Sequence, residues 1–260
     1  MRDLHVDFIN AGARVITLNT YSATPERLSR DADESMFESL QKKAIQIATD
    51  AREKAGVEGV RIAGCLPPLV ASYRPDQAPE EHIMRSTYQR IVEVEQPHVD
   101  LFICETMASI SEACTALKAA RETSLPVWVG LTVADDSSAT LRNGDEVCDA
   151  VVKIDEIGAD AKLINCSKPE AINASWQALC SGIGSVGAYA NGFTSIDALE
   201  PGGTVDSLQA RHDLGPKHYA DFVMHWVEQG ADIVGGCCEV GPAHIEVIAE
   251  RLRSENYSMQ

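Results

Sequence analysis

The sequence has little positive charge and no long apolar run. It carries 22 lysine and arginine residues against 39 aspartate and glutamate residues, for a net charge of −17. So acidic a chain lacks the positive surface that binds nucleic-acid phosphates, and no nucleic-acid partner is expected. No apolar run approaches the roughly 20 residues that cross a bilayer, and residues 1–16 lack the segments of a signal peptide. We therefore expect a cytoplasmic protein with no membrane partner.

Regular cysteine spacing and linker sequence are also missing. Eight cysteines at irregular positions among 260 residues do not resemble a disulfide scaffold, so the thiols are expected to be free or bound to metal. No low-complexity or Ser/Gly-rich stretch interrupts the chain, and 45% hydrophobic residues suffice for one large core. The sequence predicts a single domain over residues 1–260, and it leaves a homo-oligomer open.

Short apolar runs recur along the chain, each followed by a pattern with apolar residues three and four apart, which is typical of helices. Continuous apolar runs predict strands covered on both faces, as in a parallel sheet. The predicted strands are residues 13–20, 60–66, 99–106, 126–133, 161–167, 184–190 and 231–237. Ser109 with Glu112, and Ser167 with Glu170, have the spacing of helix capping boxes. The repetition predicts an α/β fold of the TIM-type (β/α)8 barrel class, with an open doubly wound sheet as the alternative.

The predicted strands number one fewer than an eight-stranded barrel needs. The chain opens on a helical pattern, residues 2–12, so that eight helical patterns stand against seven strands. The barrel therefore lacks its first β-strand at the N-terminus, and two neighbouring strands would have unpaired edges. We expect either an N-terminal truncation or a partner that covers the gap.

Polar and thiol residues stand at the carboxyl ends of the predicted strands, where barrels of this type carry their catalytic groups. These residues are Asn19, Thr20, Tyr21, Glu105, Thr106, Thr132, Asn165, Cys166, Ser167, Asn191, Cys237 and Cys238. Loops are polar in any protein, so each residue alone also has an ordinary explanation. Glu105, for example, could interact with the N-terminus of the following helix. Otherwise it is placed to receive the ammonium group of a substrate.

Three of the eight cysteines, Cys166, Cys237 and Cys238, fall on this rim. Successive side chains of a strand point to opposite faces, so Cys237 and Cys238 can share a ligand only where the strand is irregular. Gly235 and Gly236 would allow that irregularity, because glycine tolerates unusual backbone angles. The remaining cysteines lie in apolar or helical contexts and are expected to act as small hydrophobic residues: Cys65, Cys104, Cys114, Cys148 and Cys180.

Three thiolates at one point repel one another unless a cation is present. Zinc suits sulfur ligands, and three protein ligands leave a fourth position for a substrate. His244 could close the site, but it belongs to the helix that follows, so the open site is favoured. Three thiolates make the metal a poor activator of water and suit it instead to holding a substrate thiol in an electron-rich form. We therefore expect alkyl transfer to sulfur rather than hydrolysis.

The segment "INCS" (164–167), followed about seventy residues later by "GGCCEVGPAHI" (235–245), resembles the zinc signature of the homocysteine S-methyltransferases. This family includes betaine–homocysteine methyltransferase and the homocysteine module of cobalamin-dependent methionine synthase. Other stretches of the chain are also similar to the family: "AGARVITLNTYSATPERL", "AGCLPPLVASYRPD", "VDLFICETMAS", "PVWVGLTV" and "AYANGFT". Together they cover essentially the whole sequence.

The resemblance implies a (β/α)8 barrel in which Cys166, Cys237 and Cys238 bind zinc and are catalytic, with homocysteine thiolate in the fourth position. It further implies that Glu105 holds the homocysteine amino group. By the same resemblance, Thr20 and Tyr21 line the substrate pocket, and Asn191 lies near the metal, filling the open position when substrate is absent. Members of the family begin with a strand whose turn contributes to homocysteine binding. This sequence has no such segment, which leaves homocysteine recognition and barrel closure open.

A single domain without folate or cobalamin modules favours a small onium methyl donor. The prediction is transfer from S-methylmethionine or S-adenosylmethionine to homocysteine, giving methionine, with a betaine-type donor as the alternative. A barrel lyase or aldolase with Glu105 as base would need a lysine or phosphate-binding glycines at strand ends, and neither is evident. The remaining rival is a zinc-binding homologue that is catalytically impaired because the first strand is missing.

Overall fold

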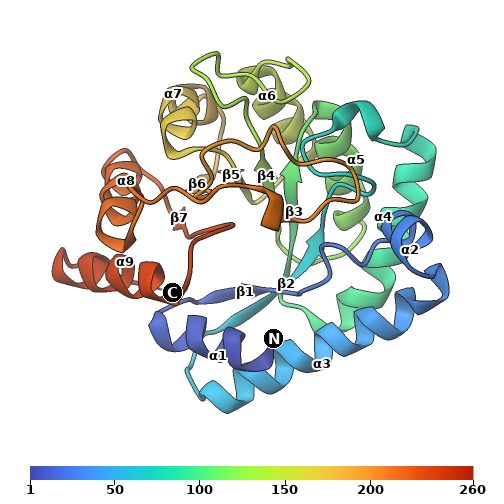
Figure 1. Ribbon diagram of the computed structural model, residues 1–260, viewed down its shortest axis with the longest axis horizontal. Coiled ribbons are helices and arrows are strands. Elements are labelled where there is room, and N and C mark those ends of the chain that lie inside the picture. The colour runs from blue at the N-terminus through green and yellow to red at the C-terminus, as the bar shows by residue number, and fades with distance from the viewer. Residues whose placement is uncertain (260) are drawn as a thin grey trace.

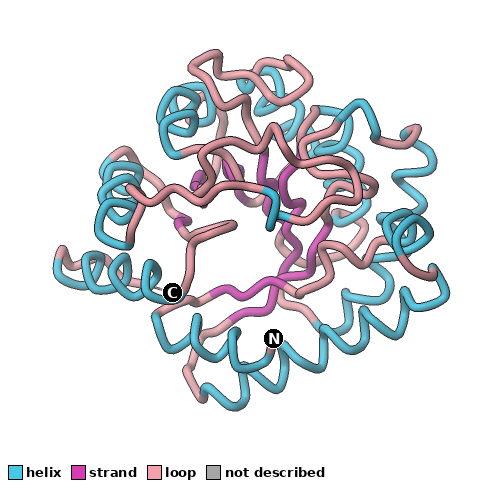
Figure 2. Tube along the Cα trace, viewed as in Figure 1, coloured by secondary structure: helices cyan, strands magenta, loops and turns pink. Residues whose placement is uncertain are grey.

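The computed structural model describes residues 1–259, in which seven parallel strands form one curved sheet with helices packed around its outside (Figures 1 and 2). The strands are β1 (Val15–Thr17), β2 (Arg61–Leu66), β3 (Leu101–Met107), β4 (Val127–Leu131), β5 (Ala161–Asn165), β6 (Ser185–Tyr189) and β7 (Ile233–Val234). Each strand pairs with the next one along the chain, from β1 to β7. A doubly wound sheet reverses its strand order at a switch point, so this order confirms the barrel class and excludes the alternative.

Each strand is followed by a helix as predicted, but two helices separate β1 from β2, so residues 1–259 contain nine α-helices where eight helical patterns were predicted. The helices are α1 (Arg2–Ala11), α2 (Pro25–Asp31), α3 (Phe37–Ala55), α4 (Glu81–Glu95), α5 (Ile110–Ala120), α6 (Val147–Ile157), α7 (Pro169–Leu179), α8 (Pro216–Glu228) and α9 (Pro242–Ser254). Figure 2 shows the long loop that connects β6 to α8. No helix within residues 1–259 is long and apolar enough to cross a membrane.

The sheet is not closed within the described residues, because β1 pairs only with β2 and β7 only with β6. The predicted count of seven strands is therefore confirmed. The outer layer continues across the opening, where α1 packs against both α3 and α9 (Figure 1). Gly12 ends α1 with a φ of 124°, and a Cβ there would lie 2.6 Å from the Ala249 side chain on α9. Glycine thus permits the close approach of these two helices.

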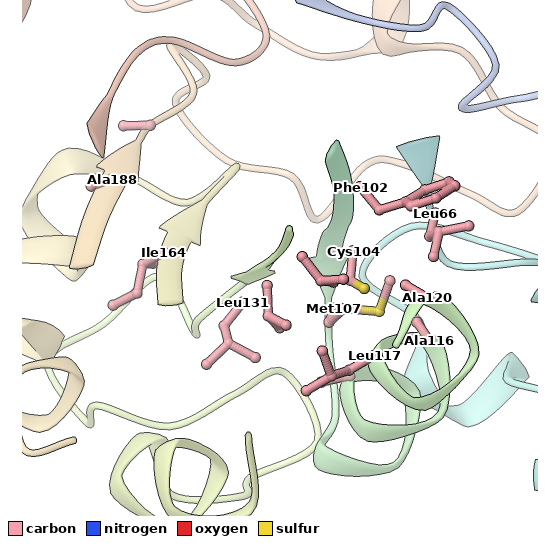
Figure 3. Close-up of a cluster of buried hydrophobic side chains, with 14 of the residues drawn as sticks. Leu66, Phe102, Cys104, Met107, Ala116, Leu117, Ala120, Leu131, Ile164 and Ala188 are labelled. Carbon is pink, nitrogen blue, oxygen red and sulfur yellow. The ribbon is translucent and has the colours of Figure 1, made fainter. Parts of the chain in front are cut away.

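Alternation along the strands divides the apolar side chains into two layers. Within β3, Leu101 and Ile103 join the cluster inside the barrel, whereas Phe102 and Cys104 pack outward against the helices (Figure 3). The pairing of β3 with β4 shifts after Cys104, and Thr106 has a left-handed φ of 62°. Such bulges redirect side chains and are common beside active sites.

The bulge in β3 decides which way its last residues face. Met107 would face inward in a regular strand, but it packs outward against Leu117 of α5 (Figure 3). Glu105, at the start of the irregular stretch, still faces inward like Ile103, as the hydrogen bond from the Tyr189 hydroxyl to its carboxylate shows. The irregularity therefore leaves a carboxyl group pointing into the barrel at the carboxyl end of β3.

Of the two serines predicted to cap helices, one does so. The Ser109 hydroxyl accepts a hydrogen bond from the backbone N–H of Glu112 at 3.2 Å and caps α5. The prediction for Ser167 is wrong, because its hydroxyl accepts from the Val133 N–H at 2.9 Å and α7 begins only at Pro169. Proline favours the first helical position, so the helix starts later than the spacing indicated. Ser167 instead connects the ends of β4 and β5.

Candidate metal centre and substrate site

Three cysteine thiols meet at the carboxyl ends of β5 and β7. The Cys166 Sγ lies 2.9 Å from that of Cys237 and 3.8 Å from that of Cys238, and the adjacent pair is 4.0 Å apart. Among the described residues, these three form the only group of His, Cys, Asp and Glu side chains close enough to hold a metal ion together. The structure therefore brings together the three cysteines that the sequence placed on one rim.

The two chain segments reach this point by irregular backbone, though not at the positions that we predicted. Neither Gly235 nor Gly236 adopts a positive φ; the left-handed residues are Cys166, at 46°, and Glu239, at 66°. Gly236 is required for a steric reason, because a Cβ there would lie 2.0 Å from the Val240 side chain. The strand itself ends at Val234, so both cysteines belong to the turn before α9. Freed from strand alternation, adjacent thiols can share one side.

Hydrogen bonds among the thiols concentrate negative charge on one sulfur. The pKa of Cys238 falls to about 4 because the thiols of Cys166 and Cys237 both bond to its sulfur. Cys237 donates to both neighbours, which raises its pKa well above the ordinary value. These pKa shifts favour a thiolate at Cys238 beside protonated thiols at its neighbours. A divalent cation can replace those protons and neutralise the charge.

The donor set and its spacing fit zinc. Zinc–sulfur bonds of about 2.3 Å in a tetrahedron place two sulfurs about 3.8 Å apart. Two of the three observed separations, 3.8 and 4.0 Å, match this value, and the third has only to open from 2.9 Å. Soft thiolate ligands favour zinc over harder cations. Cys166, Cys237 and Cys238 are therefore the residues that could hold the metal.

Glu105 lies half-buried in the same barrel mouth. Its carboxylate accepts a hydrogen bond from the Tyr189 hydroxyl at 3.3 Å, and the Cys65 thiol lies 3.8 Å from its other oxygen. Burial, together with the negative charge at Cys166, raises its pKa to about 7. A poorly solvated carboxylate that has no cationic partner among residues 1–259 is suited to bind an ammonium group.

The structure also places the residues that were assigned to the substrate pocket. The Thr20 hydroxyl donates to the buried carboxylate of Glu95 at 2.9 Å, and the Tyr21 hydroxyl lies 2.9 Å from that of Ser72. Asn191 is buried, and its side-chain nitrogen has no hydrogen-bond partner among residues 1–259.

Backbone contacts place Asn191 beside the cluster. Its neighbour Gly192 donates to the Cys238 carbonyl, and Cys237 donates to the carbonyl of Ala190, both at 2.9 Å. His244 takes no part in the cluster, because its two ring nitrogens bond the Gly241 N–H and the Leu214 carbonyl. Among the described residues, the cluster therefore consists of three thiols.

Three residues at the site were not predicted from the positions of the strand ends. Tyr73, in the loop after β2, places its hydroxyl 2.9 Å from the Cys166 sulfur. Tyr189 and Cys65 both face Glu105, although the sequence placed Cys65 among the structural cysteines. Tyr73 also borders a cavity of about 700 Å³. Loops after β2, β3 and β4 line it, with Arg74, Ser109, Ser111, Arg142 and Asn143 among the polar residues.

Glu95, behind Thr20, makes the stability of the protein sensitive to pH. Burial raises its pKa from 4.5 to about 8, so between these values the folded protein holds a proton that the unfolded chain has released. The free energy of unfolding contributed by this group therefore falls as pH rises from about 5 to about 8. Replacing Glu95 by glutamine removes the dependence, and we expect the Glu95→Gln protein to gain stability relative to wild type as pH rises. Urea unfolding at both ends of the range measures this, and a constant difference would contradict it.

The fold and the cluster together define a β/α-barrel enzyme with a three-thiol site at its mouth, and the comparisons with known proteins assign it to a family. The sequence matches the homocysteine S-methyltransferase family over residues 1–252. It is 27% identical to homocysteine S-methyltransferase 4 of Zea mays, over 99% of this chain and 80% of the maize protein. The chain belongs to the homocysteine S-methyltransferase family and is a methyltransferase.

Further relatives are similar in sequence, and a solved structure is similar in fold. The homocysteine S-methyltransferase of Escherichia coli is 27% identical, over 96% of this chain and 84% of that protein. The crystal structure of the E. coli homocysteine methyltransferase MmuM in its metallated form superposes with a TM-score of 0.78, covering 96% of this chain and 83% of that one. The S-methylmethionine–homocysteine S-methyltransferase BHMT2 of Mus musculus is 26% identical, over 98% of this chain and 70% of the mouse protein.

Proposed function

We propose that this enzyme transfers a methyl group from a small onium donor, S-methylmethionine or S-adenosylmethionine, to the thiolate of homocysteine, giving methionine. Cys166, Cys237 and Cys238 would bind one zinc ion. The observation that carries the proposal is the convergence of three thiols, 2.9 to 4.0 Å apart, in the barrel mouth that also holds Glu105. The relatives' names support homocysteine as the acceptor, and the metallated E. coli structure supports a metal.

Each residue of the mouth has a task in this reaction. When bound to three thiolates, zinc lowers the pKa of a substrate thiol and keeps its sulfur electron-rich. The carboxylate of Glu105 would pair with the homocysteine ammonium group, and the hydroxyl of Tyr189 orients that carboxylate. Asn191, with its unpartnered buried amide nitrogen, can donate to a polar group of the substrate. Homocysteine is thereby held by its amino end and by its sulfur.

The transfer itself needs positioning rather than acid or base catalysis. The homocysteine sulfur forms a bond to the methyl carbon while the bond to the donor sulfur breaks, and its electron pair stays on the donor as a neutral thioether. A thiolate and a sulfonium cation become neutral products, so a site with little water favours the step. The cavity of about 700 Å³ beyond Tyr73 is within the size range of small-molecule pockets, and we place the donor there.

Zinc content and methyl transfer, measured on the same preparation, test the proposal. The protein is purified under reducing conditions, its zinc per chain is determined, and S-methylmethionine, S-adenosylmethionine and betaine are each offered with homocysteine. We expect about one zinc per chain and homocysteine-dependent methionine formation from a sulfonium donor. Preferential use of betaine would overturn the donor assignment alone. Reduced, folded protein that neither binds zinc nor forms methionine from any donor would refute the function.

A further inference from the structure

Tyr73 contacts the thiol cluster from outside the strand ends. Its hydroxyl lies 2.9 Å from the Cys166 Sγ, although the residue belongs to the loop after β2. Its backbone has a left-handed φ of 61°. A residue other than glycine holds such a conformation at a cost of about 1 kcal/mol or more, and only where its surroundings fix it. The conformation therefore points to contacts that hold the side chain in place.

Arg142 supplies those contacts. Its guanidinium lies over the Tyr73 ring, 5.2 Å from the ring centre. The same guanidinium donates to the Asp135 carboxylate at 3.1 Å and to the Thr132 hydroxyl at 3.3 Å. Only 9% of the Arg142 side chain is exposed, so this ion pair is largely shielded from water. A planar cation paired with a carboxylate and stacked on an aromatic ring is a rigid support.

The supporting chain of residues returns to Cys166 at a second point. The Thr132 hydroxyl donates to the Cys166 carbonyl at 3.3 Å and lies 3.2 Å from the Ser167 hydroxyl. Cys166 is thus held at its sulfur by Tyr73 and at its backbone by Thr132, and Arg142 joins the two. Cys166 itself has a left-handed φ of 46°. These contacts keep it in that conformation with its sulfur facing the other two thiols.

We propose that Tyr73 is a positioning residue for the metal-binding thiolate of Cys166, and that its hydroxyl donates a hydrogen bond to that sulfur in the metal-bound protein. The inference rests on the proposed zinc function. A metal-bound thiolate carries no proton, so the Tyr73 O–H must be the donor. The bond fixes the direction of the sulfur and withdraws charge from it. Partners of this kind typically contribute 10- to 100-fold to metal affinity.

Other tyrosine hydroxyls near the mouth are engaged elsewhere. Tyr189 bonds Glu105, Tyr21 bonds Ser72, and Tyr219 bonds the carbonyls of Ala190 and Gly235. In residues 1–259, Tyr73 is the one tyrosine whose hydroxyl lies within hydrogen-bond distance of a cluster sulfur. The role is therefore assigned to a single hydroxyl group, which one substitution can remove.

Cobalt substitution and zinc competition test the hydrogen bond directly. Tyr73→Phe keeps the ring on which Arg142 stacks and deletes only the hydroxyl. We expect its affinity for zinc to fall by about 10-fold or more. We also expect the sulfur-to-cobalt charge-transfer band of the Co²⁺ protein to move to longer wavelength, because a thiolate without its hydrogen bond gives up an electron more easily. A purely structural effect on folding would not move that band.

Tyr88→Phe is the matched control. Tyr88 is a fully buried tyrosine whose hydroxyl donates to the Pro67 carbonyl at 3.0 Å rather than to a sulfur of the cluster. It should leave the band and the zinc affinity as in wild type. If Tyr73→Phe also matches wild type in both measurements, the inference is overturned while the zinc function stands. If wild type binds neither Zn²⁺ nor Co²⁺, the zinc function fails and this inference fails with it.

Discussion

Replacing Cys238 by serine is expected to abolish zinc binding and to lower methyl transfer by more than about 100-fold. Loss of a direct ligand should exceed the roughly 10- to 100-fold effect of losing a partner outside the ligand set. Cys238 is the most acidic thiol of the cluster, with a pKa lowered to about 4 by hydrogen bonds from Cys166 and Cys237. A serine hydroxyl stays protonated at neutral pH and is a harder ligand than a thiolate. The site then has two thiols in place of three.

Metal content and thiol reactivity check this result independently of turnover. Because the thiolate is the reactive form, iodoacetamide should modify metal-free wild-type protein at Cys238 at mildly acidic pH, and zinc should protect it. Cys148→Ser is the control, since Cys148 is an exposed thiol on α6 away from the cluster. It should keep zinc and full activity. A Cys238→Ser protein that retains zinc and turns over normally would show that the cluster is not the metal site.

The pattern of apolar residues predicted most of the barrel, because strands buried on both faces of a parallel sheet have uninterrupted apolar sequences. All seven strands overlap the predicted ranges, and the open edge between β7 and β1 follows from the helical pattern at residues 2–12. The ends of the strands were less predictable. Residues 231–237 were assigned to one strand, but β7 spans only Ile233–Val234. The apolar run continues into a turn in which Gly236 lies so close to Val240 that a Cβ would not fit.

The sequence likewise predicted the site residues that lie near strand ends, but not those whose position depends on tertiary contacts. Cys166 directly follows β5, Glu105 lies near the end of β3, and Cys237 and Cys238 lie in the turn after β7. The rule that strand ends share one rim therefore sufficed to bring them together. Tyr73 lies several residues beyond the end of β2, and its contact with Cys166 depends on the fold of a loop and on Arg142. No periodicity in the sequence encodes such a contact. The pattern gave the ligand candidates but not the residues that support them.

Replacing Glu105 by glutamine is expected to raise the KM for homocysteine by about 100-fold with little change in the KM for the methyl donor. The substitution leaves the substrate ammonium group in a half-buried site without an opposite charge, which costs about 3 kcal/mol, or about 100-fold in affinity. Glutamine keeps the shape of the side chain and can still accept from the Tyr189 hydroxyl. Steady-state kinetics with each substrate varied in turn separates the two KM values. Equal weakening of both would argue against ammonium binding by Glu105.

Stability measurements separate this binding defect from misfolding. The Glu105→Gln protein should bind homocysteine more weakly than wild type and yet be more stable, whereas a misfolded variant would be less stable. Burial raises the pKa of Glu105 to about 7, so the carboxylate that binds substrate destabilises the free protein as pH rises from about 5 to about 7. Glu105→Gln should therefore unfold at higher urea concentration than wild type at pH about 8, even as it loses homocysteine. Glu112→Gln removes another buried carboxyl with a pKa raised to about 7, one that bonds Ser109 at the start of α5. It should show a similar gain in stability and an unchanged KM. Both carboxylates should destabilise the free enzyme when they ionise, but only that of Glu105 should also bind the substrate.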